Sequence, residues 1–197
     1  MPKGMAYDEA TKEEIKAKLL QYCRQSWSAL GYKKTCIQDI CRHVSISVGT
    51  FYAFFATKED LFYETASAMR DELQSMCYDI LQETPGLNGF IRAMKAIYRV
   101  IDQNQFMYEA NSLDFLAFVA KLSPERIEIM KDMQYEILAM ILREANLKLK
   151  LSMGEIIGIT GVLLDTIGRK EEISLFCDHF TIYDHMVESI LPTLVEE

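Results

Sequence analysis

Helix-capping signals recur along this 197-residue chain, and no run typical of a β-strand lies between them. Thr11 followed by Glu14 is a capping-box pattern, and it opens a stretch whose apolar residues recur at three- and four-residue steps. Ser47 and Thr57 precede further stretches of this kind, and Gly31 stands where the first would end. No alternating β-branched run bounded by turn residues occurs. The pattern therefore predicts an all-α chain of about nine helices.

Charge is distributed unevenly along the chain. The formal net charge is -8, which by itself argues against binding to nucleic acid. Residues 15–58, however, carry seven basic side chains and one acidic one, Asp39, which gives this stretch about +6. The rest of the chain then carries about -14. The asymmetry indicates two parts with different tasks, although a solvated basic helix face would explain the charge alone.

Several classes of protein lack support in the sequence. No Ser/His/Asp arrangement, P-loop or dinucleotide fingerprint occurs, so we predict no enzymatic activity and no cofactor. The histidines and cysteines have no metal-ligand spacing, so we predict no metal site; a redox role for Cys23, Cys36 and Cys41 is an alternative. The longest apolar stretch, residues 156–167, is too short to span a bilayer, and the first ten residues have no signal-peptide core. We expect a cytoplasmic protein that does not bind membranes.

Residues 35–58 have the layout of a helix-turn-helix, because two short capped segments are joined by a turn at 44–46. In that motif the second helix enters the major groove of DNA. Short or phenolic side chains suit phosphate hydrogen bonds and contacts with thymine methyl groups, and this helix would present Ser47, Val48, Gly49, Thr50 and Tyr52. Lys58 begins the next helix, where its charge and the free N–H groups attract phosphate. Spacing alone leaves a generic helical bundle as the alternative.

A more specific pattern runs from Ser47 to Leu61, which reads Ser-x-Gly-Thr-x-Tyr-x-x-Phe-x-x-Lys-Glu-x-Leu. With this pattern, residues 19–61 resemble the DNA-binding domain of TetR-family transcriptional repressors. The resemblance implies a three-helix helix-turn-helix domain over 11–62, with the motif itself at about 36–55, and a larger helical effector-binding and dimerisation domain over 63–197. From the spacing and the resemblance together, the predicted DNA contacts are Thr35, Gln38, Ser47, Val48, Gly49, Thr50, Tyr52 and Lys58.

Three residues depart from the family pattern. Ser45 occupies a turn position that is usually glycine, and a positive φ there would cost about 1 kcal/mol. Val48 replaces a residue that is often basic or polar, and Phe54 replaces a frequent histidine. The operator sequence therefore does not follow from the resemblance.

The acidic C-terminal part contains a helix at 156–167 that is apolar on every side, and such a helix must be buried. The resemblance implies that this helix and the last one form a four-helix interface between two protomers. The predicted interface residues are Ile156, Ile159, Leu163, Ile167, Phe180, Tyr183, Val187 and Ile190. Burial inside one protomer is the alternative.

An effector pocket is implied among the middle helices, where methionines would provide an adaptable lining. The predicted lining residues are Phe90, Met94, Tyr98, Met107, Phe115, Phe118, Met133 and Ile137. Ordinary core packing is the alternative for each of them.

Taken together, these patterns favour a homodimeric repressor that binds double-stranded DNA at a palindromic operator. A small-molecule effector would bind the C-terminal domain and release the operator. The alternatives are an activator, or a ligand-binding or protein-interaction module of the same fold that has lost repressor activity.

Overall fold

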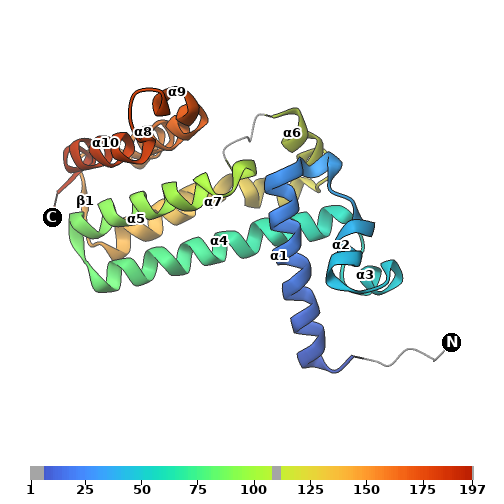
Figure 1. Ribbon diagram of the computed structural model, residues 1–197. Coiled ribbons are helices and arrows are strands. Elements are labelled where there is room, and N and C mark those ends of the chain that lie inside the picture. The colour runs from blue at the N-terminus through green and yellow to red at the C-terminus, as the bar shows by residue number, and fades with distance from the viewer. Residues whose placement is uncertain (1–6, 108–111, 197) are drawn as a thin grey trace. The chain divides into compact units, whose positions relative to one another are not determined.

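The computed structural model describes residues 7–107 and 112–196, which are mostly helical (Figure 1). They divide into two compact units. Unit 1 comprises residues 7–68 and 112–122, and unit 2 comprises residues 69–107 and 123–196. One helix, α4 (Lys58–Glu83), contributes residues to both units. The division differs from a single boundary near residue 62, because residues 112–122 pack with the N-terminal part of the chain.

Unit 1 is built from α1 (Glu9–Lys34), α2 (Ile37–Val44), α3 (Val48–Phe54), the first turns of α4, and α6 (Leu113–Val119). Helix α1 begins before the residue that its capping pattern predicts. The cap of α1 is Asp8, whose carboxylate accepts a hydrogen bond from the Thr11 N–H at 2.8 Å. The cap of α2 is Cys36, because the hydroxyl of Thr35 is already engaged at the end of α1, where it donates to the Gly31 carbonyl.

Aromatic rings form the centre of unit 1. Trp27 of α1 is almost completely buried, and its ring lies 4.7 Å from that of Phe62 on α4 and 5.1 Å from that of Phe118 on α6. Beneath α3, Phe51 and Phe55 are fully buried as well. The segment 112–122 therefore belongs to unit 1 because it supplies rings to the same core as α1 and α4.

A kink near the end of α1 is held by a carboxylate from α6. Gly31 has φ 81°, a backbone conformation that breaks the helix for one residue. The two N–H groups beyond the break, those of Tyr32 and Lys33, donate to the carboxylate of Asp114. A Cβ atom on Gly31 would lie 2.6 Å from Oδ2 of Asp114, so a larger residue would disturb this contact as well as the backbone.

Unit 2 contains the remaining elements: α5 (Gly86–Asp102), η1 (Gln105–Met107), α7 (Pro124–Glu144), α8 (Met153–Asp165), η2 (Thr166–Arg169), α9 (Lys170–Ser174) and α10 (His179–Leu194). The sequence predicts one helix over 105–122, whereas the structure has η1 and α6 there, with 108–111 outside the described residues. It also predicts one final helix over 172–191, whereas a break at 175–178 separates α9 from α10.

A short antiparallel pair joins β1 (Lys148–Leu149) to β2 (Val195–Glu196). The predicted all-α fold class is confirmed, and this pair is a local addition to it. Strands of two residues are too short to show the alternating pattern by which a strand is recognised in sequence.

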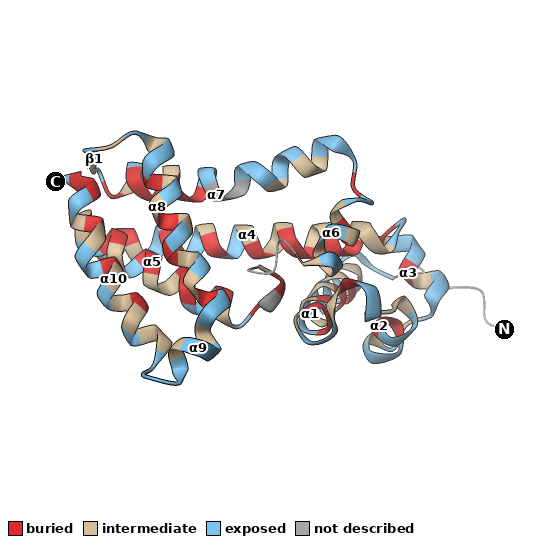
Figure 2. Cartoon of the chain, turned by 90° about the horizontal axis from the view of Figure 1, so that it is seen from above, coloured by how far each residue is buried: buried red, intermediate tan, exposed pale blue. Residues whose placement is uncertain are grey.

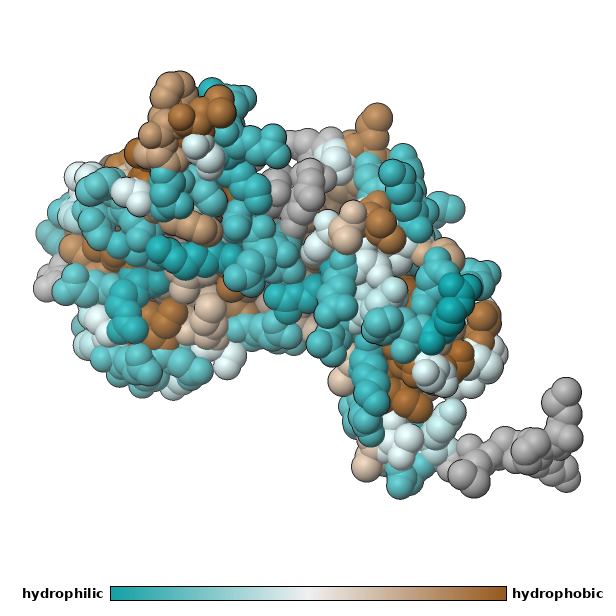
Figure 3. All heavy atoms as spheres, in the orientation of Figure 1, coloured by the Kyte–Doolittle hydropathy of each residue, from teal (hydrophilic) through white to brown (hydrophobic). Residues whose placement is uncertain are grey.

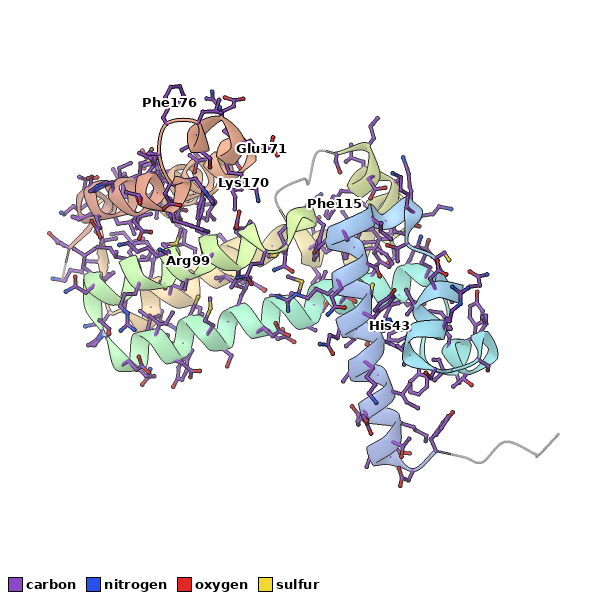
Figure 4. The ribbon with its side chains drawn as sticks, in the orientation of Figure 1. His43, Arg99, Phe115, Lys170, Glu171 and Phe176 are labelled. Carbon is purple, nitrogen blue, oxygen red and sulfur yellow. The ribbon has the colours of Figure 1, made fainter. Side chains whose placement is uncertain are left out.

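The core of unit 2 lies where α10 packs against α5. The rings of Tyr98 on α5 and Tyr183 on α10 stack with their centroids 3.7 Å apart. Arg99, labelled in Figure 4, donates two hydrogen bonds to Asp184 at the edge of this contact. Figure 2 shows the buried positions of α5 and α10 in red. Among the described residues, no helix combines the length and apolarity needed to cross a membrane.

Ser45, between α2 and α3, has φ 62° and ψ 40°, so the turn is left-handed at a residue that carries a Cβ. We predict that Ser45→Gly raises the free energy of unfolding by about 1 kcal/mol, because glycine has no Cβ to strain in this conformation. Urea unfolding followed by circular dichroism measures the change. Ser45→Ala, which keeps the Cβ, is the control, and equal stability of the two variants would contradict the prediction.

Burial separates the cysteines by reactivity. It raises the pKa of the Cys23 and Cys77 thiols to about 12, while Cys177 is exposed. Since the thiolate is the reacting form, we predict that at pH 8 a disulfide reagent labels Cys177 in the folded protein and labels Cys23 and Cys77 only after denaturation. Mass spectrometry of the labelled peptides gives the result. Rapid labelling of Cys23 in the folded protein would contradict the prediction.

Candidate functional site

The start of α3 is fixed by its N-cap residue, Ser47. Its Oγ accepts a hydrogen bond from the Thr50 N–H at 2.9 Å and shares a second one, of 2.8 Å, with the Thr50 hydroxyl. Ser47 therefore caps α3 as the sequence predicts. Both hydroxyls lie at the beginning of the helix, where its free N–H groups favour an anion.

The outer face of α3 is exposed and held from below. Phe51 and Phe55 anchor the helix in the core of unit 1, and their rings lie 5.7 Å apart. Val48 and Gly49 are exposed, and the side chain of Tyr52 is 53% exposed. A seven-residue helix thus presents a short, largely uncharged surface on a fixed support.

Gly49 has no packing role inside unit 1. A Cβ atom built on it would meet only the Ser47 Oγ, at an ordinary contact distance of 3.6 Å. Glycine is therefore not needed here for the fold of the free protein. What glycine provides at this exposed position is a backbone that another molecule can approach closely.

Two of the predicted DNA contacts are engaged within unit 1. Thr35 is only 2% exposed, and its hydroxyl donates to the Gly31 carbonyl at 2.7 Å. The ammonium of Lys58 donates to the Tyr32 carbonyl and lies 4.2 Å from the centroid of the Tyr32 ring. Burial lowers the pKa of Lys58. Both side chains therefore hold the end of α1 instead of standing free at the surface.

Other cations of unit 1 are exposed, among them one pair on α1 and one arginine on α2. Lys33 and Lys34 occupy the last turn of α1, and Arg42 is near the end of α2, where its guanidinium donates to Asp39 at 2.9 Å. They belong to the basic stretch found in the sequence, but the family pattern does not single them out. Gln38 is exposed on α2 as well.

A hollow of about 520 Å³ lies between α1 and α2 beside these cations. Its lining includes Arg42 and the stacked rings of Tyr22 and His43, whose centroids are 3.8 Å apart (His43 is labelled in Figure 4). The hollow belongs to unit 1, as does the exposed face of α3.

The predicted effector residues lie in packed cores. Phe90, Met94, Tyr98 and Ile137 are buried in the core of unit 2, and Met107 is partly buried against it. Phe115 and Phe118 do not lie with them but belong to unit 1, where both rings pack near Trp27. The side chain of Met133 is outside the described part of the structure.

Unit 2 has a groove of about 730 Å³ between α4 and α7, and its lining contains none of the eight effector residues given above. On α4 its lining is Asp71, Gln74, Ser75 and Tyr78, and on α7 it is Tyr135, Glu136, Ala139, Met140 and Arg143. Both sets recur at three- and four-residue steps, so each set forms one flank of its helix. Apolar periodicity identifies core faces, and it gives no signal for a polar and aromatic flank such as this one.

Most of the predicted dimer residues belong to the core of their own protomer. Ile156, Leu163, Ile167, Tyr183 and Val187 are fully or almost fully buried there. Ile159, Phe180 and Ile190 are partly buried against the same core. On a helix that is apolar all round, the larger side chains face inward, because α8 packs against α7 and α10.

Another face of α8 is open. Gly154 and Gly158 are exposed, with no atom within 4 Å of a Cβ built on either, and the side chain of Val162, four residues further on, is 68% exposed. Beyond α9, Phe176 is 88% exposed and points away from the ribbon in Figure 4. The apolar surface at this end of unit 2 is visible in brown in Figure 3.

Comparison with known proteins shows what this part of the chain is similar to. Residues 19–65, which contain α2, α3 and the exposed face described above, match the model of the bacterial regulatory proteins of the tetR family. An uncharacterized HTH-type transcriptional regulator, YdgC of Bacillus subtilis (strain 168), is 26% identical over 141 residues, which are 72% of this chain and 68% of YdgC.

Two solved structures share the fold. A TetR-family transcriptional regulator from Pectobacterium atrosepticum has a TM-score of 0.63 at 18% identity, over 97% of this chain and 99% of that one. The regulator FadR from Bacillus subtilis, solved in complex with stearoyl-CoA, has a TM-score of 0.64 at 14% identity, over 87% and 95% of the two chains. Residues 19–65 therefore match the tetR family of bacterial regulatory proteins, and the chain shares the fold of these two regulators.

Proposed function

We propose that this protein is a homodimeric repressor that binds a palindromic operator and releases it when a small molecule binds unit 2. The observation that carries the proposal is the outer face of α3, which is capped by Ser47, anchored by buried phenylalanines and free of any packing role at Gly49. A regulator of this kind would act in the bacterial cytoplasm, where the chromosome is.

DNA would be contacted by the first turns of α3, inserted into the major groove. The methyl groups of Val48 suit contact with a thymine methyl, and the Ser47 and Thr50 hydroxyls suit phosphate oxygens. Gly49 would let the backbone approach a phosphate closely, and the phenol of Tyr52 can donate a hydrogen bond to one. These contacts would position α3 in the major groove, and they do not determine which base sequence is bound.

The exposed cations of unit 1 would supply the attraction to the phosphate backbone. Lys33, Lys34 and Arg42 are all exposed and lie near the ends of α1 and α2. Each phosphate contact made by a cation releases counterions, so affinity should fall steeply as the salt concentration rises.

Dimerisation would use the open face of α8, because glycines at 154 and 158 leave room for a partner helix at close range. A two-fold pair of protomers matches the two-fold symmetry of a palindrome, whose half-sites lie about 34–36 Å apart along the duplex.

An effector in unit 2 would act by binding one arrangement of the protein better than another. The stearoyl-CoA complex of FadR supports a small-molecule effector for a protein of this fold. Since α4 contributes residues to both units, a ligand that shifts α4 would bear on unit 1 directly. An activator would share the DNA contacts, and transcription assays with and without the protein distinguish the two.

The experiment that tests the proposal is a mobility-shift assay with the DNA upstream of the protein's own gene, at increasing salt and with unrelated DNA as competitor. We expect a sequence-dependent shift that weakens with salt. The proposal fails if the protein shifts both DNAs alike or shifts neither.

Gly49→Ala separates DNA approach from folding. We predict that it leaves the stability unchanged or raises it by up to about 1 kcal/mol, because the added methyl meets only Ser47 and alanine favours the helix. The same methyl should weaken operator binding about tenfold by keeping the backbone away from the DNA. Urea unfolding and fluorescence anisotropy with labelled operator measure the two effects.

Ala53→Gly is the matched control for Gly49→Ala, because Ala53 is also exposed on α3 and the change runs in the opposite direction. It should lower stability by about 0.5–1 kcal/mol while changing operator affinity less. If Gly49→Ala binds the operator as well as the natural protein does, the proposed approach at Gly49 is wrong.

Gly158→Leu tests the dimer face. The protomer has open space at this position, so the leucine should not disturb its core, while a partner helix packed at close range would be displaced. We predict that light scattering shows a monomer and that the helical circular dichroism spectrum is unchanged. Glu171→Leu, at an exposed position on α9, is the control, and we expect it to stay dimeric. A dimeric Gly158→Leu protein would exclude this face.

A further inference from the structure

The groove between α4 and α7 is lined by an aromatic ring from each helix. Tyr78 on α4 is 47% exposed and Tyr135 on α7 is 51% exposed, so neither ring is buried in the core and both can contact a ligand. Between them, Ala139 and the partly buried Met140 give the lining a small apolar area. Ring faces and a methionine side chain are surfaces that bind apolar or positively charged groups.

The charge of the groove is negative. Its lining has two carboxylates, Asp71 and Glu136, and one guanidinium, that of Arg143. Arg143 donates to Glu144, outside the lining, at 3.0 Å, and Asp71 is paired with Arg70 at 2.9 Å. Glu136 has no ion pair within the described part of the chain, and it is exposed on α7. The lining therefore carries one more carboxylate than cations, and Glu136 is the carboxylate without an ion pair among the described residues.

The surrounding helix faces explain why the groove stays open. On α4, Leu73, Cys77 and Leu81 face the core of unit 2, and on α7 the buried positions begin at Ile137. Figure 2 shows the first half of α7 without a buried position among its described side chains. The apolar faces of both helices belong to the core of unit 2, and their polar flanks outside that core bound a space of about 730 Å³.

We propose that this groove binds an amphipathic organic cation, in which a positive charge is attached to aromatic or alkyl groups. Glu136 would balance the charge, and Tyr78 and Tyr135 would bind the cation and its apolar groups. A volume of this size suits a ligand of drug-like dimensions. The inference rests on the proposed function, because such a cation would be the effector. An anionic ligand such as a fatty acid or a phosphate ester is disfavoured by the carboxylate of Glu136, which is unpaired among the described side chains.

Tetraphenylphosphonium and tetraphenylborate test the proposal, because the two ions have nearly the same size and shape and opposite charge. Isothermal titration calorimetry with the full chain should show tetraphenylphosphonium binding once per protomer, at least about tenfold tighter than tetraphenylborate. Glu136→Gln should weaken the binding of the cation about fivefold, and Tyr78→Leu and Tyr135→Leu about three- to fivefold each.

Glu128→Gln is the matched control, because Glu128 is an exposed carboxylate on α7 that does not line the groove. Its affinity for tetraphenylphosphonium should equal that of the natural protein, and thermal unfolding should show that every variant is folded. The proposal is overturned if the two ions bind equally, if the cation does not bind, or if its binding survives all three groove substitutions.

The mobility-shift assay on the same preparation separates this inference from the proposed function. If the protein shifts its upstream DNA but does not bind tetraphenylphosphonium, the regulator function stands and the cation inference fails. If the cation binds as expected and no DNA is shifted, the groove assignment stands and the repressor proposal fails.

Discussion

The burial of aromatic rings around Trp27 is the interaction on which unit 1 depends. Its α2 and α3 have eight and seven residues, and helices this short are unstable in isolation. They form because they bury apolar side chains within unit 1, Ile40 and Cys41 from α2 and Phe51 and Phe55 at α3. The exposed face of α3 is therefore held in place by the buried side chains on the opposite face of the helix. The position of Val48 and Tyr52 in any contact with DNA therefore depends on phenylalanine rings that are buried beneath α3.

In unit 2, one face of a helix packs in the core and another face of the same helix is exposed. The inward face of α8 carries Ile156 and Leu163, which belong to the protomer's core. The outward face of α8 has open space at Gly158, where no side chain is present. On α4 and α7, apolar faces belong to the core of unit 2 and polar flanks line a groove outside it. The side chains with the greatest burial hold the protomer together, so binding surfaces have to be sought among those that the core leaves out.

Local signals in the sequence predicted local structure well. Ser47 caps α3, and Ser45 has the positive φ that its place in the turn implied. The sequence did not predict which partner each side chain meets across the fold. Thr35 and Lys58 match the family pattern, yet their polar atoms bond to carbonyls of α1, a contact that no periodicity encodes. Likewise, an apolar residue such as Ile156 has the same signature whether its neighbour belongs to its own chain or to another.

The carboxylate of Asp114 caps two N–H groups of α1 from a segment more than 80 residues away, and Phe118 of that segment packs on Trp27. The structural module that presents α3 is thus assembled from two separate stretches of chain, and the family match over 19–65 covers only part of it. A fragment cut after residue 68 would keep every motif of the DNA-binding surface and lose one wall of the core beneath it. The compact unit that carries α3 therefore extends beyond the segment of sequence that matches the family.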